Sequence, residues 1–227
     1  MIVLGVDVDL VVFDLDGTLI DSERAIVQAA ERAFADLGVA VPEIQVADHL
    51  GAPLEELYAL FVGDGDDARL RSFIAHYIAR HDEHPDRFPP PLPGVVEGLA
   101  ALHGRGLPLG VATTKPSARA ASQLEAAGLL RWFGHVQGTD PGMRPKPHPD
   151  VVQRACAALS IAPGRALMVG DTPRDVAAAH SAGAAAVVVG YTVERRRAAG
   201  SFGARSVIGS IAELCGIIAV CVSSLCS

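Results

Sequence analysis

Two carboxylates beside an apolar run are the feature of this sequence with the clearest chemical meaning. Asp14 and Asp16 follow Val11-Val12-Phe13, three consecutive apolar side chains that predict a strand buried on both faces. Two ionised carboxylates held together at the end of such a strand are costly unless a cation or a proton offsets their charge. The stretch therefore favours a metal site, although a strand followed by an ordinary acidic turn has the same composition.

Other polar side chains stand where further apolar strands are predicted to end. They are Thr113, Thr114 and Lys115 after residues 109–112, Lys146 after residues 135–138, and Asp171 and Asp175 after residues 166–169. The carboxyl ends of parallel strands lie at one edge of a sheet, where ligand sites form. We therefore expect these groups to collect beside Asp14 and Asp16. Taken singly, Lys146 in a proline-rich loop and acidic residues at a helix start have ordinary structural explanations.

The elements that would position these groups alternate along the second half of the chain. Strands are predicted at 107–113, 135–138, 166–169, 186–189 and near 207, and helices at 95–103, 117–127, 149–159, 173–182 and from 210. Such alternation is typical of a parallel sheet with helices on both faces. The strand at 11–13 belongs to the same sheet. The predicted fold class is therefore α/β, with a Rossmann-like core.

A helical segment interrupts this core between its first and second strands. Helices are predicted after Asp21-Ser22, from Pro53 and near Asp66, and no strong strand pattern occurs between residues 22 and 87. The stiff, proline-rich run from Phe88 to Gly94 ends the segment. We therefore predict a core domain of residues 1–20 and 90–227, with an inserted helical cap domain of residues 21–89.

Composition limits the partners that this chain can have. At 227 residues, half of them hydrophobic, the chain can form a sizeable core. Its formal net charge of −7 argues against nucleic acid as a partner, although local cations still permit an anionic substrate. The four cysteines form no C-x-x-C pair, no convincing signal peptide is present, and the apolar run from Cys215 to Cys226 is too short to cross a bilayer. We expect a cytoplasmic protein without a membrane partner.

The polar motifs together resemble those of the haloacid dehalogenase superfamily of phosphohydrolases. The resemblance covers nearly the whole chain and rests on Asp14-Leu15-Asp16-Gly17-Thr18, Thr113, Lys146 within Lys-Pro-His-Pro-Asp, and Gly170-Asp171-x-x-x-Asp175. The segment Leu92-Pro93-Gly94 is similar to the cap exit of the phosphoglycolate phosphatase-like branch. That branch commonly has Asn where this sequence has Thr114, which leaves the chemistry intact but weakens the assignment of one substrate.

The resemblance implies a catalytic role for four residues. Asp14 would attack phosphorus and form an aspartyl-phosphate, and Asp16 would protonate the leaving alcohol and then act as a base toward water. Thr113 would donate a hydrogen bond to the phosphoryl group. Lys146 would balance the charges of the phosphate and of Asp14.

The resemblance also implies Mg²⁺ as the cofactor. The expected ligands are carboxylate oxygens of Asp14 and Asp171 and the backbone carbonyl of Asp16, since Mg²⁺ prefers oxygen ligands. Asp175 belongs to the same predicted metal site. It is expected to hold the metal's waters or to position a neighbouring group in preference to ligating the metal itself.

The expected substrate is a small phosphorylated metabolite, either phosphoglycolate-like or a sugar phosphate. Thr113, Thr114 and Lys146 are its predicted binding residues, and Gly51, in a cap loop, is a weaker hypothesis for specificity. The alternatives are a phosphosugar mutase of the same superfamily and a non-catalytic phosphate-binding protein. A dehalogenase is disfavoured by Asp16, and a phosphonate hydrolase by the absence of lysine between residues 22 and 87. A monomer and a homodimer are both compatible with the sequence.

Overall fold

The structure, a computed structural model, describes residues 7–218. The chain divides into two compact units: unit 1 comprises Met1–Ile20 and Pro91–Ser227, and unit 2 comprises Asp21–Pro90. The cysteines of the C-terminal tail, Cys221 and Cys226, lie outside the described residues. None of the helices in residues 7–218 combines the length and apolar character that a membrane crossing requires.

Unit 1 is built on a six-stranded parallel sheet with the order β3-β2-β1-β4-β5-β6. The strands are β1 (Leu10–Phe13), β2 (Leu109–Ala112), β3 (His135–Gln137), β4 (Ala166–Gly170), β5 (Ala185–Val189) and β6 (Ser206–Ile208). The predicted α/β Rossmann-like core is therefore confirmed. The chain builds outward from β1 to β3, then returns to β4 on the other side of β1. The reversal makes the β1–β4 pair a topological switch point, where sites form in such sheets.

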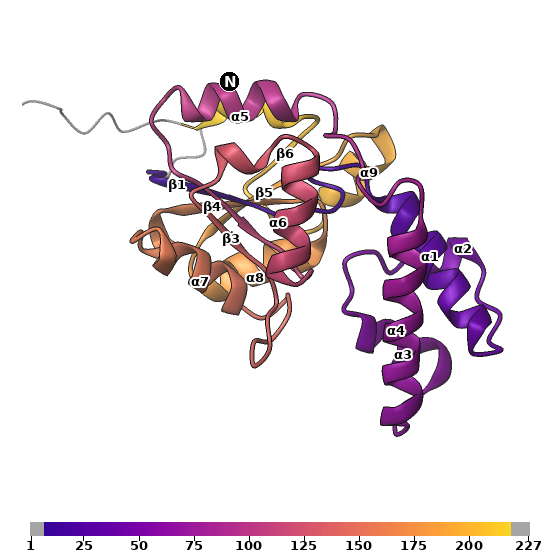
Figure 1. Cartoon of the computed structure of the whole chain (residues 1–227). Helices are drawn as coiled ribbons and strands as arrows, with labels where there is room; N and C mark the ends of the chain where they lie inside the picture. Colours follow the sequence, from indigo (N-terminus) through magenta and orange to yellow (C-terminus); the bar gives the residue numbers. More distant parts are fainter. Residues whose placement is uncertain (1–6, 219–227) are drawn as a thin grey trace, which may run out of the picture. The chain divides into compact units, whose positions relative to one another are not determined.

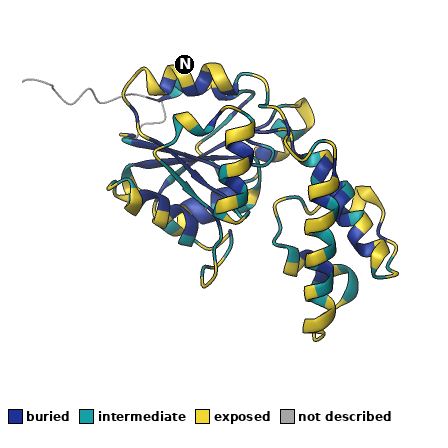
Figure 2. Ribbon diagram, in the orientation of Figure 1, coloured by how far each residue is buried: buried dark blue, intermediate teal, exposed yellow. Residues whose placement is uncertain are grey.

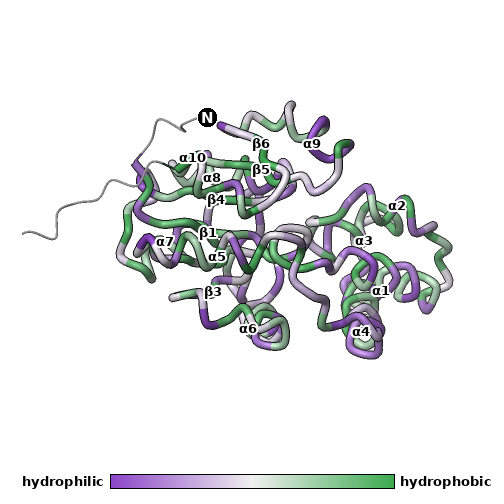
Figure 3. The backbone as a smooth tube through the Cα atoms, turned by 90° about the horizontal axis from the view of Figure 1, so that it is seen from above, coloured by the Kyte–Doolittle hydropathy of each residue, from purple (hydrophilic) through white to green (hydrophobic). Residues whose placement is uncertain are grey.

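Helices cover both faces of this sheet (Figure 1). They are α5 (Val95–His103), α6 (Ser117–Ala126), α7 (Asp150–Ala158), α8 (Pro173–Ala182), α9 (Val193–Ala199) and α10 (Leu214–Ile217), with 3₁₀ turns at Leu130–Trp132, Pro163–Arg165 and Ile211–Glu213. The short helix α9 was not predicted. Figure 3 colours much of this segment as hydrophilic residues, so the sequence has no apolar stripe that would predict a helix here.

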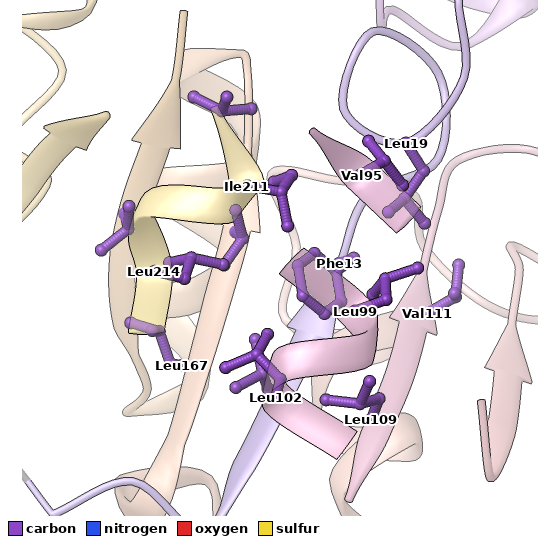
Figure 4. Packing of buried hydrophobic residues seen from close by; sticks show 14 of the residues in the cluster. Phe13, Leu19, Val95, Leu99, Leu102, Leu109, Val111, Leu167, Ile211 and Leu214 are labelled. Atoms are coloured by element: carbon purple, nitrogen blue, oxygen red, sulfur yellow. The ribbon is translucent and has the colours of Figure 1, made fainter. Parts of the chain in front are cut away.

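Side chains of β1 alternate between two separate hydrophobic clusters. Val11 and Phe13 belong to the cluster under α5 and α10, whereas Leu10 and Val12 belong to the cluster on the opposite face. Figure 4 shows Phe13 beside Leu99 of α5, and Figure 2 shows that the strands are buried. Apolar groups cover both faces of β1, so the first charged side chain after the strand, Asp14, stands just beyond its carboxyl end.

Unit 2 is entirely helical, and none of residues 21–90 lies in a strand. Its helices are α1 (Glu23–Asp36), α2 (Glu43–Ala47), α3 (Leu54–Val62) and α4 (Asp67–Glu83). The rings of Phe34 and Phe73 stack at 4.4 Å between centroids inside a separate hydrophobic cluster, and Arg80 binds both carboxylate oxygens of Asp36 at 2.7 and 2.8 Å. Three of these helices were predicted; α2, with five residues, was not.

Candidate active site

The Asp-x-Asp segment leaves the sheet in a tight turn against β4. The Asp14 amide still donates to the Val169 carbonyl of β4 at 2.8 Å, so this carboxylate starts from a fixed backbone. Gly17 follows with φ 74°, a conformation that favours glycine. A Cβ at Gly17 would overlap the carboxylate of Asp171, and Thr18 Oγ1 donates to Asp171 Oδ1 at 2.9 Å. The turn after β1 thus packs directly on the first residue after β4.

Three carboxylates meet at this point. One oxygen each of Asp14, Asp171 and Asp175 lie within 4.8 Å of one another. Burial, with added repulsion from Asp175 and Asp16, raises the pKa of Asp14 to about 6 against the attraction of Lys146. The pKa of Asp171 is raised well above its usual range by burial and by Asp175 and Asp14. Several carboxylates held close together can bind a divalent metal ion, which would offset their negative charge. Carboxylate oxygens are the ligand type that Mg²⁺ prefers.

Lys146 is the buried cation of this cluster. Its Nζ lies 2.8 Å from Asp14 Oδ1 and 2.6 Å from Asp175 Oδ1, and only 2% of the side chain is exposed. Burial alone lowers the pKa of a lysine, but Asp14 and Asp175 outweigh it, and the pKa of Lys146 is raised. Lys146 is therefore a permanent positive charge beside Asp14.

Asp175 is held by protein donors at both of its oxygens. Oδ1 accepts from Lys146, and Oδ2 accepts from the amide of Thr172 at 3.0 Å and from its hydroxyl at 2.7 Å. This is a capping box at the start of α8. Gly170 allows the close approach, because a Cβ there would overlap Asp175. The arrangement favours the expected positioning role of Asp175 over direct ligation.

The loop that carries Lys146 is tied to the start of α7. The backbone amide and the guanidinium of Arg144 bind the carboxylate of Asp150 at 3.0 and 2.8 Å. Lys146 Nζ also donates to the Ala112 carbonyl at the end of β2, at 3.3 Å. His148 is exposed in this loop, so the structure does not place it with the carboxylates.

Thr113 and Thr114 follow β2 at the same edge of the sheet. Thr113 is buried, its amide donates to the Gln137 carbonyl of β3 at 2.9 Å, and its hydroxyl oxygen accepts from the Lys115 amide at 3.3 Å. A hydroxyl that accepts in this way can still donate its own proton to a ligand. Thr114 is half-buried next to it.

Sequence reasoning assigned no role to Lys115, which the structure brings to Asp16. Its Nζ lies 2.8 Å from Asp16 Oδ1 and also donates to Gln123 Oε1 of α6. Two signals were available in the sequence. Lys115 directly follows Thr113-Thr114 at a predicted strand end, and it is one of two lysines in the chain.

Two residues after β5 were also missed. The Tyr191 hydroxyl donates to the Thr18 carbonyl at 2.7 Å, and burial, followed by the charge of Asp171, raises the pKa of Tyr191. Arg195 of α9 lies 3.6 Å from Asp171, from Nη1 to Oδ2. In the sequence, the run Arg195-Arg196-Arg197 has the composition of a solvated face. Arg195 instead faces the acidic cluster.

Gly51 is not part of this cluster of unit 1. It belongs to unit 2, where it lies exposed after α2 with φ 83°. Its role in specificity stays a prediction. The residues that unit 1 brings to the carboxyl edge of its sheet are Asp14, Asp16, Thr113, Thr114, Lys115, Lys146, Asp171 and Asp175.

Comparison with known proteins gives concordant matches. A family model described as haloacid dehalogenase-like hydrolase matches residues 11–189. The probable phosphatase IndB of Dickeya dadantii is 39% identical over 188 residues, covering 81% of this chain and 82% of that protein. The phosphoglycolate phosphatase of Rhodospirillum rubrum is 34% identical over 213 residues, covering 90% and 88%. A haloacid dehalogenase-like hydrolase structure from Bacteroides fragilis matches with a TM-score of 0.82 at 25% identity, covering 92% of this chain and 100% of that chain.

These matches extend over both halves of the acidic cluster. The family model includes the turn after β1 and the segment from β4 into α8, which hold Asp14 and Asp171. The motif resemblance seen in the sequence and the whole-chain comparisons therefore agree. The chain belongs to the haloacid dehalogenase-like hydrolases, within their phosphoglycolate phosphatase-like branch, and is an enzyme of the phosphatase class.

Proposed function

We propose that this enzyme is a Mg²⁺-dependent phosphatase that hydrolyses a small phosphorylated metabolite through an aspartyl-phosphate on Asp14. The observation that carries the proposal is the cluster of Asp14, Asp171 and Asp175 at the β1–β4 switch point, with Lys146 in contact with Asp14 and Asp175. Phosphoryl transfer to a carboxylate requires concentrated positive charge, because two unit charges about 4 Å apart repel by roughly 4 kcal/mol at an effective dielectric near 20. Lys146 supplies part of that charge.

Asp14 and Asp16 divide the chemistry between them. A carboxylate oxygen of Asp14 attacks phosphorus, the bond from phosphorus to the ester oxygen breaks, and Asp16 gives a proton to the leaving oxygen. Water then attacks the phosphorus of the aspartyl-phosphate while Asp16 accepts a proton from it. The bond to Asp14 breaks, inorganic phosphate leaves, and both side chains return to their starting states.

Lys146 and Thr113 bind the group that is transferred. The Lys146 ammonium, 2.8 Å from Asp14, offsets the charge of the phosphoryl oxygens, and the buried Thr113 hydroxyl donates to one of them. Asp14, Asp171 and the Asp16 carbonyl would hold Mg²⁺, with Asp175 behind them. When bound, the ion supplies Lewis-acid polarisation of the phosphoryl group.

Unit 2 is proposed to act as the cap that covers the substrate. The two connections to it run together: the Asp21 amide donates to the Pro90 carbonyl at 3.0 Å, and Ile20 forms a bridge with Pro91. Paired connections of this kind concentrate the change of backbone angles in a few residues, as lid closure requires. Gly51 remains the candidate specificity position in this unit.

Mg²⁺ should stabilise the protein more at pH 7.5 than at pH 5. The raised pKa of Asp14, about 6, means that the folded state holds a proton which the unfolded state releases near pH 4. Metal-free stability should therefore fall as pH rises from about 4 to 6, by on the order of 3 kcal/mol for this group. Mg²⁺ must displace that proton at pH 5 but not at pH 7.5. Thermal unfolding with and without Mg²⁺ measures the difference.

Asp171→Asn provides the control for that measurement. The substitution removes an expected ligand while keeping the size of the side chain, so the Mg²⁺-dependent rise in Tm should largely disappear at both pH values. A rise in the wild-type protein that is equal at pH 5 and pH 7.5, or larger at pH 5, would contradict metal binding at these carboxylates.

A phosphate-ester panel with Mg²⁺ tests the function itself. It includes 2-phosphoglycolate, pyrophosphate and both anomers of glucose 1-phosphate, with inorganic phosphate and glucose 6-phosphate measured as products. We expect phosphate release from at least one member and its loss with EDTA. Conversion to glucose 6-phosphate with little free phosphate would instead support the mutase alternative. Binding of a phosphate mimic without any turnover would support the non-catalytic one.

A further inference from the structure

The two lysines of this chain each contact one carboxylate of the Asp-x-Asp pair. Lys146 lies 2.8 Å from Asp14, and Lys115 lies 2.8 Å from Asp16. The other basic residues counted with them, 17 of 19, are arginines. Lysine carries a compact charge that donates in three directions, whereas arginine presents a planar fork. Each carboxylate of the Asp-x-Asp pair therefore has a compact ammonium group beside it.

The Lys115–Asp16 pair is shielded from solvent. The exposed fraction of the side chain is 10% for Lys115 and 22% for Asp16. Exposed ion pairs contribute little because water screens them and because both side chains must be immobilised. Here the immobilisation is provided by Gln123, 4% exposed on α6, whose amide oxygen accepts from the same ammonium. The ammonium thus has two fixed acceptors, one from the turn after β1 and one from α6.

The backbone of Lys115 is fixed as well. Its amide donates to Thr113 Oγ1 at 3.3 Å, and its carbonyl accepts from the Thr139 amide at 3.2 Å. A Cβ at Gly138 would overlap the Lys115 carbonyl, so glycine permits this close approach of the two loops. Lys115 is consequently held at both ends of its side chain before any substrate arrives.

The loop after β3 reinforces this arrangement. Asp140 accepts from the Ser117 amide at 3.0 Å and from its hydroxyl at 2.7 Å, and Ser117 Oγ accepts from the Gly138 amide at 2.7 Å. These bonds fix the start of α6, on which Gln123 lies two turns later. Gln123 of α6 therefore holds the Lys115 ammonium, and the ammonium in turn holds the carboxylate of Asp16.

We propose that Lys115 is a positioning residue for Asp16, held in place by Gln123. Its contact with Oδ1 orients the carboxylate so that Oδ2 exchanges the proton, first with the leaving oxygen and then with water. The inference rests on the proposed function, in which Asp16 is the acid and base. Because a proton transfer requires hydrogen-bond distance in the reacting complex, a loose carboxylate costs rate and leaves substrate affinity intact.

A double-mutant cycle with Asp16 tests this proposal. With an alkyl phosphate found active in the panel, Lys115→Met should lower kcat by about 10- to 100-fold and change KM by less than about threefold. In an Asp16→Asn background, the same substitution should change kcat by no more than about threefold, since the group through which Lys115 acts is gone. An equal loss in both backgrounds would overturn the proposal, because it would mean direct substrate contact or a general structural effect.

The leaving group provides a second, independent readout. A 4-nitrophenolate group departs without a proton, so the loss caused by Lys115→Met should be smaller for 4-nitrophenyl phosphate than for the alkyl ester. Gln123→Leu should show the same pattern with a smaller amplitude. Lys115→Arg should recover part of the activity, and the exposed Arg197→Met is the control for lost positive charge. Equal losses for both esters, or no loss at all, would contradict the positioning role.

Failure of this inference and failure of the proposed function give different results. If wild-type protein releases no phosphate, the proposed function is wrong. If wild type is active and Asp14→Asn is not, while Lys115→Met keeps full kcat, the function stands and only the role of Lys115 is wrong. Thermal unfolding of each variant separates a folding defect from a kinetic one, and Lys115→Arg remains available if Lys115→Met fails to fold.

Discussion

Asp14→Asn is expected to lower kcat by at least about 10⁴-fold, with little effect on folding. The amide has the size of the carboxylate but cannot attack phosphorus, so the covalent route is closed. Asp14 is buried with two other carboxylates and its pKa is raised to about 6 by burial, so losing its charge should not destabilise the fold. Phosphate release under saturating substrate and Mg²⁺, together with Tm, measures both effects.

Asp7→Asn is the matched control for this substitution. Asp7 precedes the opposite end of β1 and its side chain is 63% exposed, so its variant should keep wild-type kcat. A rapid quench of wild-type enzyme during turnover, followed by mass spectrometry, should find phosphate on the peptide that contains Asp14. Turnover by Asp14→Asn above about 1% of wild type, after purification from contaminating phosphatases, would remove Asp14 as the nucleophile.

The boundaries of some elements follow directly from local residue chemistry. The predicted helices at 95–103 and 173–182 agree with α5 and α8 to the residue. Gly94 and Gly183 adopt φ of 79° and 85° at the ends of these helices, and Pro173 begins α8. Glycine permits a positive φ because it lacks a Cβ, and proline fixes φ through its ring, so the effect of both residues is visible without any tertiary information.

The short helices α2 and α9 show where that local information ends. Neither is long enough to display a full apolar stripe, and α9 contains three consecutive arginines. Helices of this length are unstable alone and depend on packing. In α9 the buried residue is Ala199, which belongs to the hydrophobic cluster on one face of the sheet, and the helix contacts β5 and β6. Nothing adjacent in sequence specifies that contact.

The sequence was enough to predict which residues gather at the candidate site, but not which of them contact one another. Parallel strands bring their carboxyl ends to one edge, which is enough to group Asp14, Asp171 and Lys146. The pairing within the group depends on contacts between residues far apart in sequence. Lys115 and Asp16 are 99 positions apart, and Lys146 and Asp175 are 29 apart. Periodicity contains no information about such pairs, and this is why the role of Lys115 emerged only from the structure.

Lys146→Met should remove both activity and a pH-dependent part of the stability. Lys146 contacts Asp14 and Asp175 at 2.8 and 2.6 Å with only 2% of its side chain exposed. Without it, the two buried carboxylates of Asp14 and Asp175 lose their buried cation, and breaking such a contact typically costs about 3–5 kcal/mol. The phosphoryl group loses the same charge, so kcat should fall by at least about 10³-fold. Urea unfolding without Mg²⁺ and steady-state phosphate release measure the two losses.

The pH dependence identifies electrostatics as the cause of that destabilisation. Removing the ammonium raises the pKa of Asp14 further, so the folded variant binds protons that the unfolded chain has released. The variant should therefore approach wild-type stability near pH 5, and its stability deficit relative to wild type should grow progressively up to pH 8. Lys146→Arg, which keeps the charge but not the compact shape, should retain more stability than activity. A deficit that is constant between pH 5 and pH 8 would instead indicate lost packing, because a cavity left by methylene groups does not titrate.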